Sequence, residues 1–403
     1  MATSLILSTG LVVIAWLWLR FAKREVSLPL WSTLEIPQLA ADASPFVSII
    51  VAAGNRAQDL ERCVRSLLRQ DYARFEVIVV DAISSAETRG HLLEMEATAQ
   101  GTLRVMPGQH SPTGGLNRRA TLRQAMEAAR GDWLLFTMAE TYHAPGLLTR
   151  AMAYAQLQGL GMLSLAPRHE CRSFWEHVWQ PTAFQYLAFL RPLEQVRVAA
   201  ARGVWASEAF LMVSREACVK AGGHAALSSV YELHEADHLM RQVKSLGYRV
   251  EFVRAMDLLL TRPYRHFREL WDSWGQSLYV RFGGSSLRVA AHAVGIFAWA
   301  VLPFAALIPA FSFGLWGLDT VREWWDVAFA VSAILVVVTI LQAESVVRRV
   351  HRQSHFYAVT LPLGGLCLAA AALAGCVREV AWRKPPANDA RRSDTAMTRS
   401  RRC

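Results

Sequence analysis

The sequence predicts an α/β domain with a mostly parallel sheet, flanked by transmembrane helices. Between residues 47 and 253, short apolar runs alternate with amphipathic helical patterns, an order typical of α/β domains. Outside this region, several stretches are long enough, or nearly so, for the ~17–25 apolar residues of a spanning helix. These stretches lack Asp, Glu, Lys and Arg and cover residues 4–19, 289–318, 327–341 and 357–377. The hydrophobic fraction of 53% also exceeds the ~45–50% of soluble proteins.

The elements of the α/β domain follow from the length and period of each apolar run. Short runs rich in branched and aromatic residues are typical of buried strands, whereas apolar residues spaced three to four apart indicate helices. We expect strands at residues 47–51, 75–80, 103–106, 133–137, 162–165, 210–213 and 249–253. We expect helices at residues 59–70 and 117–130, one that begins near Pro145, and one that ends at residues 241–246.

Basic residues near the apolar stretches indicate how the chain lies in a membrane. Residues 1–24 are better explained as an uncleaved anchor than as a signal peptide, because they have no basic start and no small-residue cleavage site. A basic cluster at residues 20–24 directly follows the apolar part. By the positive-inside rule, it places the α/β domain at residues 45–262 in the cytoplasm. We therefore expect a multi-pass protein of a bacterial-type inner (plasma) membrane.

The C-terminal part is expected to form a transmembrane region with about three hydrophobic segments at residues 285–380, and then a disordered basic tail at residues 385–403. Counting the spans places this tail outside, whereas the positive-inside rule places it inside, and both alternatives stay open. The net charge of +10 comes largely from bases near the ends of apolar stretches, so we expect no nucleic-acid partner. The six cysteines show no CxxC or zinc-ligand spacing.

Two acids come shortly after predicted strands. Asp81 follows the strand at residues 75–80, and Glu140 comes just past the strand at residues 133–137. Open α/β sheets bind ligands at the carboxyl ends of their strands. Two carboxylates there could hold a divalent cation against a diphosphate, because Mg²⁺ usually needs only one or two protein carboxylates. Capping of a following helix explains each acid equally well. The run at residues 52–56 lacks GxGxxG, which argues against a nicotinamide cofactor.

Residues 263–284 combine an aromatic face and a charged face at helical spacing. Trp271 and Trp274 recur on the aromatic face, and Arg265 and Arg268 lie on the charged face. Trp and Arg anchor helices at the level of lipid headgroups, so we expect an interfacial helix whose residues meet the membrane or the acceptor. A surface helix that packs on the sheet is the alternative.

Several short motifs occur in a particular order. They are VSIIVAAGN at residues 47–55, SLLRQDY at 66–72, VIVVD at 77–81, AARGDWLLFT at 128–137, GGH at 222–224 and the stretch 262–274. With these motifs, residues 45–284 resemble family-2 glycosyltransferases of the GT-A fold, in particular membrane enzymes that glycosylate hopanoids, carotenoids and ceramides. The resemblance implies a nucleotide-sugar donor, with a UDP-sugar favoured, a lipid-like acceptor at the cytoplasmic membrane face, and Mg²⁺ or Mn²⁺.

The resemblance also implies roles for individual residues in donor binding. Asp81 would contact the nucleoside, and Asn55 belongs to the same nucleotide-binding set. Arg118 would stand where the family has a lysine that meets the phosphates. Glu140 would be the last acid of the Asp-x-Asp motif that holds the metal and the diphosphate.

The acceptor-activating acid is where the chain departs most from the family. The base position falls on Ala236, with Glu235 and Asp237 on either side, and one of these two acids would take its role. A shift of one residue rotates a helical side chain by about 100°, so at most one of them faces the cleft. Other acid pairs of the family are also reduced to single acids. We therefore weigh an active glycosyltransferase against a non-catalytic relative that serves as a membrane-bound partner or scaffold.

Overall fold

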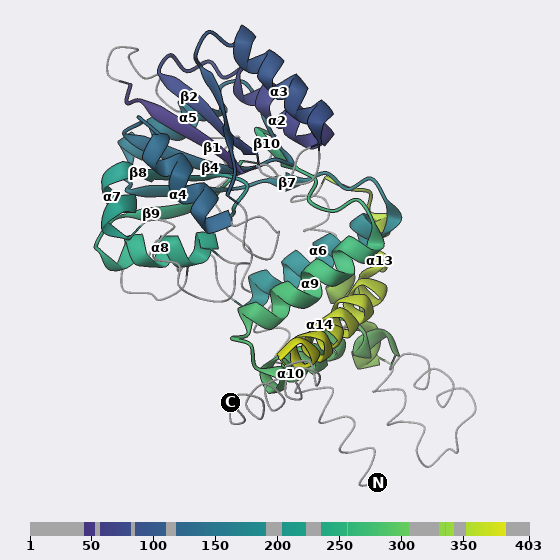
Figure 1. The fold of residues 1–403 in the computed structure, drawn as a ribbon. Helices are drawn as coiled ribbons and strands as arrows, with labels where there is room; N and C mark the ends of the chain where they lie inside the picture. The colour runs from purple at the N-terminus through teal and green to yellow at the C-terminus, as the bar shows by residue number, and fades with distance from the viewer. Residues whose placement is uncertain are drawn as a thin grey trace, which may run out of the picture.

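The computed structural model describes most of the α/β domain and a group of helices beside it (Figure 1). The described residues are 44–52, 57–81, 85–109, 118–190, 204–222, 235–255, 257–305, 330–334, 336–341 and 352–383. The predicted anchor at residues 1–24, the predicted tail at residues 385–403 and Asn55 lie outside them.

A seven-stranded sheet forms the centre of the domain, in the order β3-β2-β1-β4-β8-β6-β9. The strands are β1 (Val47–Ala52), β2 (Phe75–Asp81), β3 (Leu103–Pro107), β4 (Trp133–Met138), β6 (Met162–Ala166), β8 (Leu211–Ser214) and β9 (Val250–Arg254). Strands β3, β2, β1 and β4 are parallel neighbours, as are β6 and β9. Strand β8 runs antiparallel to both β4 and β6. The prediction of a mostly parallel sheet is thus confirmed.

Helices cover both faces of this sheet. One face carries α2 (Ala57–Leu67), α3 (Ala86–Thr98) and α5 (Leu147–Leu157), and the other carries α4 (Arg118–Ala128), α7 (Arg215–Lys220) and α8 (Glu235–Ser245). In β1, Ile49 and Val51 pack in the core on the side of α2, α3 and α5, and Ile50 packs in the core on the side of α4, α7 and α8. All three are fully buried. A strand that is buried on both faces is a continuous apolar run, which is why these strands could be predicted.

A second, three-stranded sheet has the order β5-β10-β7. It consists of β5 (Thr141–His143), β7 (Arg168–His169) and β10 (Leu259–Thr261). Strand β10 pairs antiparallel with β5 and parallel with β7. These strands are too short to be detected by period. They bring the chain that follows β10 close to the end of β4.

Five further helices form a layer beside the sheet domain (Figure 1). They are α6 (Phe174–Leu190), α9 (Phe267–Arg281), α10 (Ser286–Ala300), α13 (Phe356–Val359) and α14 (Leu361–Arg383). Helix α9 is the predicted amphipathic helix. Its apolar face packs against α6 and α14, where Leu270, Trp274 and Leu278 are buried in one core. Helices α6 and α14 therefore cover this face. The prediction that the helix meets a membrane stays a prediction.

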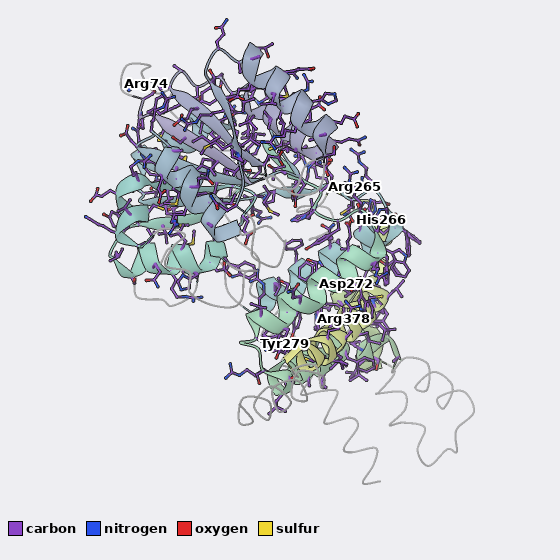
Figure 2. The ribbon with its side chains drawn as sticks, viewed as in Figure 1. Arg74, Arg265, His266, Asp272, Tyr279 and Arg378 are labelled. Carbon is purple, nitrogen blue, oxygen red and sulfur yellow. The ribbon has the colours of Figure 1, made fainter. Side chains whose placement is uncertain are left out.

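Helices α9 and α14 meet through glycines. A Cβ at Gly375 would lie 2.4 Å from the main-chain oxygen of Gly275, and a Cβ at Gly275 would lie 2.7 Å from that of Ala371. Real Cβ atoms do not approach backbone so closely, so only glycine fits at these two positions. Figure 2 shows Asp272 and Arg378 side by side on the same two helices, and these side chains form an ion pair.

One helix of the described part is long and apolar enough to cross a membrane, the segment Leu361–Arg378 of α14. Half of that segment is buried inside the protein. Ser286–Ala300 and Ala330–Leu341 are apolar but shorter. The predicted C-terminal region of about three spans thus corresponds to one helix of sufficient length among the described residues. A helix of this kind is weak evidence for a membrane span, because buried core helices have the same composition.

A buried charge network joins the amino ends of the strands. Glu76 accepts hydrogen bonds from Ser48 Oγ at 2.7 Å and from the Arg130 main-chain N–H at 2.7 Å. The Gly131 N–H donates to Ser48 Oγ at 2.7 Å. Burial alone would raise the pKa of Glu76, but these hydrogen bonds and the Arg130 side chain together bring the pKa below its usual value. The motif at residues 128–133 thus serves the fold at the edge opposite to the ligand edge.

Gly131→Ala is expected to destabilise the domain by ~1–3 kcal/mol, the usual cost of overpacking a core. The new Cβ would lie 2.4 Å from the Ser48 main-chain nitrogen, which cannot move without breaking the network. Gly90→Ala is the matched control, because a Cβ on this helical glycine meets nothing within 4 Å. It should be neutral or stabilise by about 0.5–1 kcal/mol. Urea unfolding measures both changes, and equal effects of the two variants would refute this account.

Candidate active site at the carboxyl edge of the sheet

The two predicted acids lie at the same edge of the sheet. Ala52 is in register with Val80 on one side and with Met138 on the other. Asp81 comes one residue beyond this row, and Glu140 comes two residues beyond it. Asp81 is 4% exposed, and its main-chain oxygen accepts a hydrogen bond from the Gly108 N–H at 2.9 Å. The side chain of Arg118, at the start of α4, lies outside the described part of the chain, as does Asn55.

Glu140 sits in the turn between β4 and β5, and β10 holds that turn in place. The main-chain oxygen of Glu140 accepts hydrogen bonds from the Arg262 N–H at 3.3 Å and from Thr261 Oγ1 at 3.3 Å. Within the turn, Thr141 Oγ1 donates to the Met138 main-chain oxygen at 2.6 Å. These bonds bring the segment that begins at Arg262 next to the acid.

Four arginines and two acids surround a small pocket at this turn. The pocket has a volume of about 50 Å³ and is lined by Asp59, Arg62, Glu140, Thr141, Arg172, Arg262 and Arg265. The arginines come from α2, from the segment after β7 and from the segment after β10. Figure 2 shows Arg265 where the sheet domain meets the first turn of α9. Guanidinium groups bind diphosphates through charge-assisted hydrogen bonds, so the pocket favours an anionic ligand.

Ion pairs fix the arginines of this pocket. Arg265 Nη2 lies 2.5 Å from Asp59 Oδ1, and Arg262 Nη2 lies 3.0 Å from Glu176 Oε1. Arg62 donates to both carboxylate oxygens of Glu170, at 3.3 and 3.4 Å. Each guanidinium has five N–H donors, so these contacts leave donors for a ligand. The pairs therefore orient the guanidinium groups before a ligand binds.

The donors of the pocket meet the minimum requirement of the implied divalent cation. No group of three or more His, Cys, Asp or Glu side chains in the described ranges is placed to hold a metal. Asp59 and Glu140 nevertheless share the pocket, and Asp59 Oδ2 is buried without a hydrogen-bond partner among the described residues. Mg²⁺ often takes one or two carboxylates and completes its shell with water and substrate phosphates. The two acids thus fit a cation that binds together with a diphosphate.

The acids of α8 have different surroundings from those that the sequence suggests. Asp237 is 5% exposed, and its Oδ1 accepts a hydrogen bond from the Ala206 N–H at 2.8 Å. Its Oδ2 lies 3.4 Å from Arg281 Nη1. Ala236 is buried in the core between α8 and the sheet. The side chain of Glu235, the first residue of α8, is outside the described set. The carboxylate of Asp237 therefore connects α8 to α9 and to the segment before β8.

Of the four residues predicted to meet the acceptor or the membrane, the structure brings Arg265 to the pocket. Trp274 is buried, and Trp271 packs edge to face on Trp179 with ring centroids 5.9 Å apart. The Arg268 side chain is 88% exposed and lies 3.8 Å from Asp272. Sequence reasoning missed Asp59, Arg62, Arg172 and Arg262 as site residues. No signal joins them, because α2, β7 and β10 are far apart in the chain.

A second pocket lies where the sheet domain meets the ends of α6 and α9. It has a volume of about 210 Å³ and is lined by Leu187, Leu190, Trp205, Arg281, Phe282 and His292. The Arg281 guanidinium lies over the Trp205 ring, 5.2 Å from its centroid. The His292 and Phe282 rings are stacked, with centroids 3.7 Å apart. For scale, an apolar cavity of ~150 Å³ holds a benzene molecule.

Comparisons with known proteins agree with this fold. Residues 44–270 match the family model described as "Glycosyltransferase like family 2". The chain is 27% identical to Uncharacterized protein MT1568 of Mycobacterium tuberculosis, over 49% of this chain and 62% of the relative. It is 29% identical to Uncharacterized glycosyltransferase EpsJ of Bacillus subtilis, over 30% of this chain and 33% of the relative. The matches thus span less than two thirds of these relatives.

The solved structures that resemble this chain include mannosyltransferase PcManGT from Pyrobaculum calidifontis, in complex with GDP-Man and Mn²⁺. That likeness has 16% sequence identity and a TM-score of 0.48, and covers 92% of this chain and 98% of the other. The family match carries more weight, because it takes in the whole seven-stranded sheet and more than half of the 403 residues. The chain therefore belongs to the family-2 glycosyltransferases.

Proposed function

We propose that this protein transfers a sugar from a nucleotide-sugar donor, with a UDP-sugar favoured, to a lipid-like acceptor at the cytoplasmic face of a membrane. The observation that carries the proposal is the arginine-lined pocket with Asp59 and Glu140 at the carboxyl edge of the sheet. An acceptor hydroxyl attacks the anomeric carbon of the sugar, and the bond to the diphosphate breaks. The electron pair of that bond leaves with the nucleoside diphosphate, whose growing negative charge the guanidinium groups stabilise.

A divalent cation fits the same pocket. Asp59 and Glu140 would hold it, and it would supply Lewis-acid neutralisation of the diphosphate charge. The guanidinium groups of Arg262 and Arg265 line the same pocket, where they orient the diphosphate for departure. Asp81, at the end of β2, is the candidate contact for the nucleoside, together with Asn55 and Arg118.

Exposed apolar side chains support a membrane-associated acceptor. On α10, α13 and α14, Leu287 is 82% exposed, Phe356 is 66% exposed and Val377 is 71% exposed. Large exposed apolar surfaces on a protein indicate contact with a membrane or a partner. The 210 Å³ pocket at the junction with Trp205 has space for a small apolar part of an acceptor. Both features favour an amphiphilic acceptor over a soluble sugar.

A non-catalytic relative is the second candidate, and one observation favours it. Ala236 occupies the position of the family's base, and the neighbouring Asp237 carboxylate is held by the Ala206 N–H and Arg281. Such a protein would bind a nucleotide but transfer no sugar.

Transfer from radiolabelled UDP- and GDP-sugars to extracted lipids, with the full chain in membranes, separates the two candidates. We expect a labelled lipid with a UDP-sugar. Arg265→Gln should weaken UDP binding by about tenfold or more, because a hydrogen bond between charged groups contributes ~1.5–3 kcal/mol. Arg268→Gln, on the exposed side of α9, is the control and should bind UDP normally. UDP binding without transfer from any donor would favour the non-catalytic relative. If Arg265→Gln binds UDP as tightly as Arg268→Gln and the parent do, the assignment of this pocket to the donor is refuted.

A further inference from the structure

The acceptor hydroxyl needs a group that takes its proton, and α8 supplies a poor candidate. Both carboxylate oxygens of Asp237 contact the protein, one at the Ala206 N–H and the other at Arg281. Ala236 cannot accept a proton. A general base must approach the reacting hydroxyl to within ~2.6–3.2 Å, so a carboxylate that is already bound on both sides is badly placed. This leaves open which other acid of the chain reaches the ligand edge.

Strand β8 runs against its neighbours and so begins at the ligand edge. Leu211, its first residue, is in register with Phe136, near the carboxyl end of β4. The residues just before β8 therefore lie at the edge where Asp81 and Glu140 lie. Glu208 is three residues ahead of Leu211. Its neighbour Ala209 accepts a hydrogen bond from Thr137 Oγ1 at 2.7 Å, which ties this segment to the strand that leads to Glu140.

Hydrogen bonds on both sides hold Glu208 in position. The Ser207 N–H donates to Ser164 Oγ at 2.8 Å, and the Ala209 N–H donates to Ser207 Oγ at 3.3 Å. The Ala206 N–H donates to Asp237 Oδ1 at 2.8 Å. Glu208 itself is half-buried, between the exposure of a surface acid and that of a core residue. The segment is therefore fixed to β6 and to the first turn of α8.

The Tyr264 hydroxyl interacts electrostatically with both Glu140 and Glu208. Burial raises the pKa of the Tyr264 hydroxyl, and a hydrogen bond with Ser273 Oγ at 3.2 Å lowers it. The negative charges of Glu140 and Glu208 raise it further, and the positive charge of Arg281 lowers it. The charges of Glu140, Glu208 and Arg281 therefore all act on the Tyr264 hydroxyl. Arg281 also lines the 210 Å³ pocket.

We propose that Glu208 is the general base of the transfer reaction, an inference that rests on the proposed function. Its carboxylate takes the proton of the acceptor hydroxyl while the hydroxyl oxygen bonds to the anomeric carbon and the bond from sugar to diphosphate breaks. Glu208 is then a carboxylic acid, and the nucleoside diphosphate carries the electron pair. Asp237 acts as a positioning residue, because it holds the Ala206 N–H two residues ahead of the base. Glu208 thus supplies the acid that the Ala236 position lacks.

Glu208→Gln tests this assignment with little change in shape. We expect kcat to fall by ~10²–10⁴, the contribution of a general base, while UDP binding by calorimetry stays within a few-fold of the parent. Added formate should restore part of the rate to Glu208→Ala, because a small carboxylate can enter the vacated space. Glu216→Gln is the control. That acid is 67% exposed on α7 and pairs with Lys220, so kcat should not change.

The pH dependence separates the base from its positioning residue. In the parent, kcat should fall at low pH as the base becomes protonated, and this fall is the acid limb of the curve of kcat against pH. Glu208→Gln should remove the acid limb, whereas Asp237→Ala should lower kcat and keep it. If Glu208→Gln transfers sugar at half the parental rate or more, or if Glu235→Gln alone abolishes the acid limb, the assignment to Glu208 is wrong. Failure of formate to rescue a folded, UDP-binding Glu208→Ala also overturns it. If the parent itself transfers no sugar from any donor, the proposed function fails, and the assignment to Glu208 falls with it.

Discussion

Arg262→Ala is expected to lower the free energy of unfolding by ~3–5 kcal/mol, the cost of leaving a buried charge without its partner. Glu176 is 0% exposed, and Arg262 donates to both of its carboxylate oxygens, at 3.0 and 3.4 Å. The Arg172 N–H adds a bond at 2.7 Å. Arg262→Ala removes the only side chain among the described residues that forms an ion pair with this carboxylate. Denaturant unfolding of the purified chain measures the change.

Two further variants make this result specific. Arg262→Ala combined with Glu176→Gln should regain part of the lost stability, because the buried charge is then absent. Arg172→Ala removes the charge of an exposed pair with Glu170, and should cost ~1 kcal/mol or less. If the Arg262 and Arg172 variants lose equal free energy of unfolding, the buried pair of Arg262 and Glu176 does not stabilise the fold more than an exposed pair does.

The same pair predicts how stability depends on pH. Burial raises the pKa of Glu176, but the hydrogen bonds from Arg262, the Arg172 main chain and Ser173 outweigh burial and lower it. A carboxyl with a lowered folded pKa stabilises the fold above its unfolded pKa, and this contribution is lost as the pH falls through the folded value. Arg262→Ala should therefore flatten the acid side of the curve of stability against pH.

Glu140→Gln is expected to lower kcat by ~10²–10³, the usual effect of removing one group that stabilises charge in a transition state. The amide keeps the shape of the side chain but loses the negative charge that a cation needs. Among the described residues, Asp59 and Glu140 are the two carboxylates that line the pocket, so Mn²⁺ should bind weakly alone and more tightly with UDP. Electron paramagnetic resonance of Mn²⁺, with and without UDP, measures this coupling independently of activity.

Asp59→Asn should weaken the same UDP-dependent binding of Mn²⁺. A control is Asp257→Asn, because this acid is 41% exposed and pairs with Arg352, away from the pocket. Tight Mn²⁺ binding by the Glu140 and Asp59 variants alike would show that the cation is held elsewhere.

The sheet could be predicted because its strands are buried on both faces. Ile49, Ile50 and Val51 form an unbroken apolar run, and such a run is typical of a strand that is buried on both faces. The register then places Asp81 and Glu140 at one edge, as expected from their positions after β2 and β4. Strands β5, β7 and β10 have two or three residues each, too few for any period.

The site could be predicted only in part, because it depends on contacts between distant segments. Asp59 and Arg265 are 206 residues apart, yet their side chains pair across the pocket. The direction of β8 cannot be inferred from its apolar run. Without that direction, the sequence does not tell at which edge of the sheet Glu208 lies. The apolar face of α9 indicates that this face is buried, but not whether a lipid surface or other helices cover it. The sequence favours a lipid surface, whereas the structure shows α6 and α14.

The glycine contact between α9 and α14 sets where the chain can be shortened. The family match ends at residue 270, inside α9, and a soluble fragment that stops near residue 284 would look like a natural unit. Such a fragment would lack α14, and Leu270, Trp274 and Leu278 would lose part of their cover. Expression trials of the catalytic part alone should therefore give aggregates. A fragment that extends through α10 and keeps residues 361–383, joined by a linker, should stay monodisperse, because α14 packs on α10 as well as on α9.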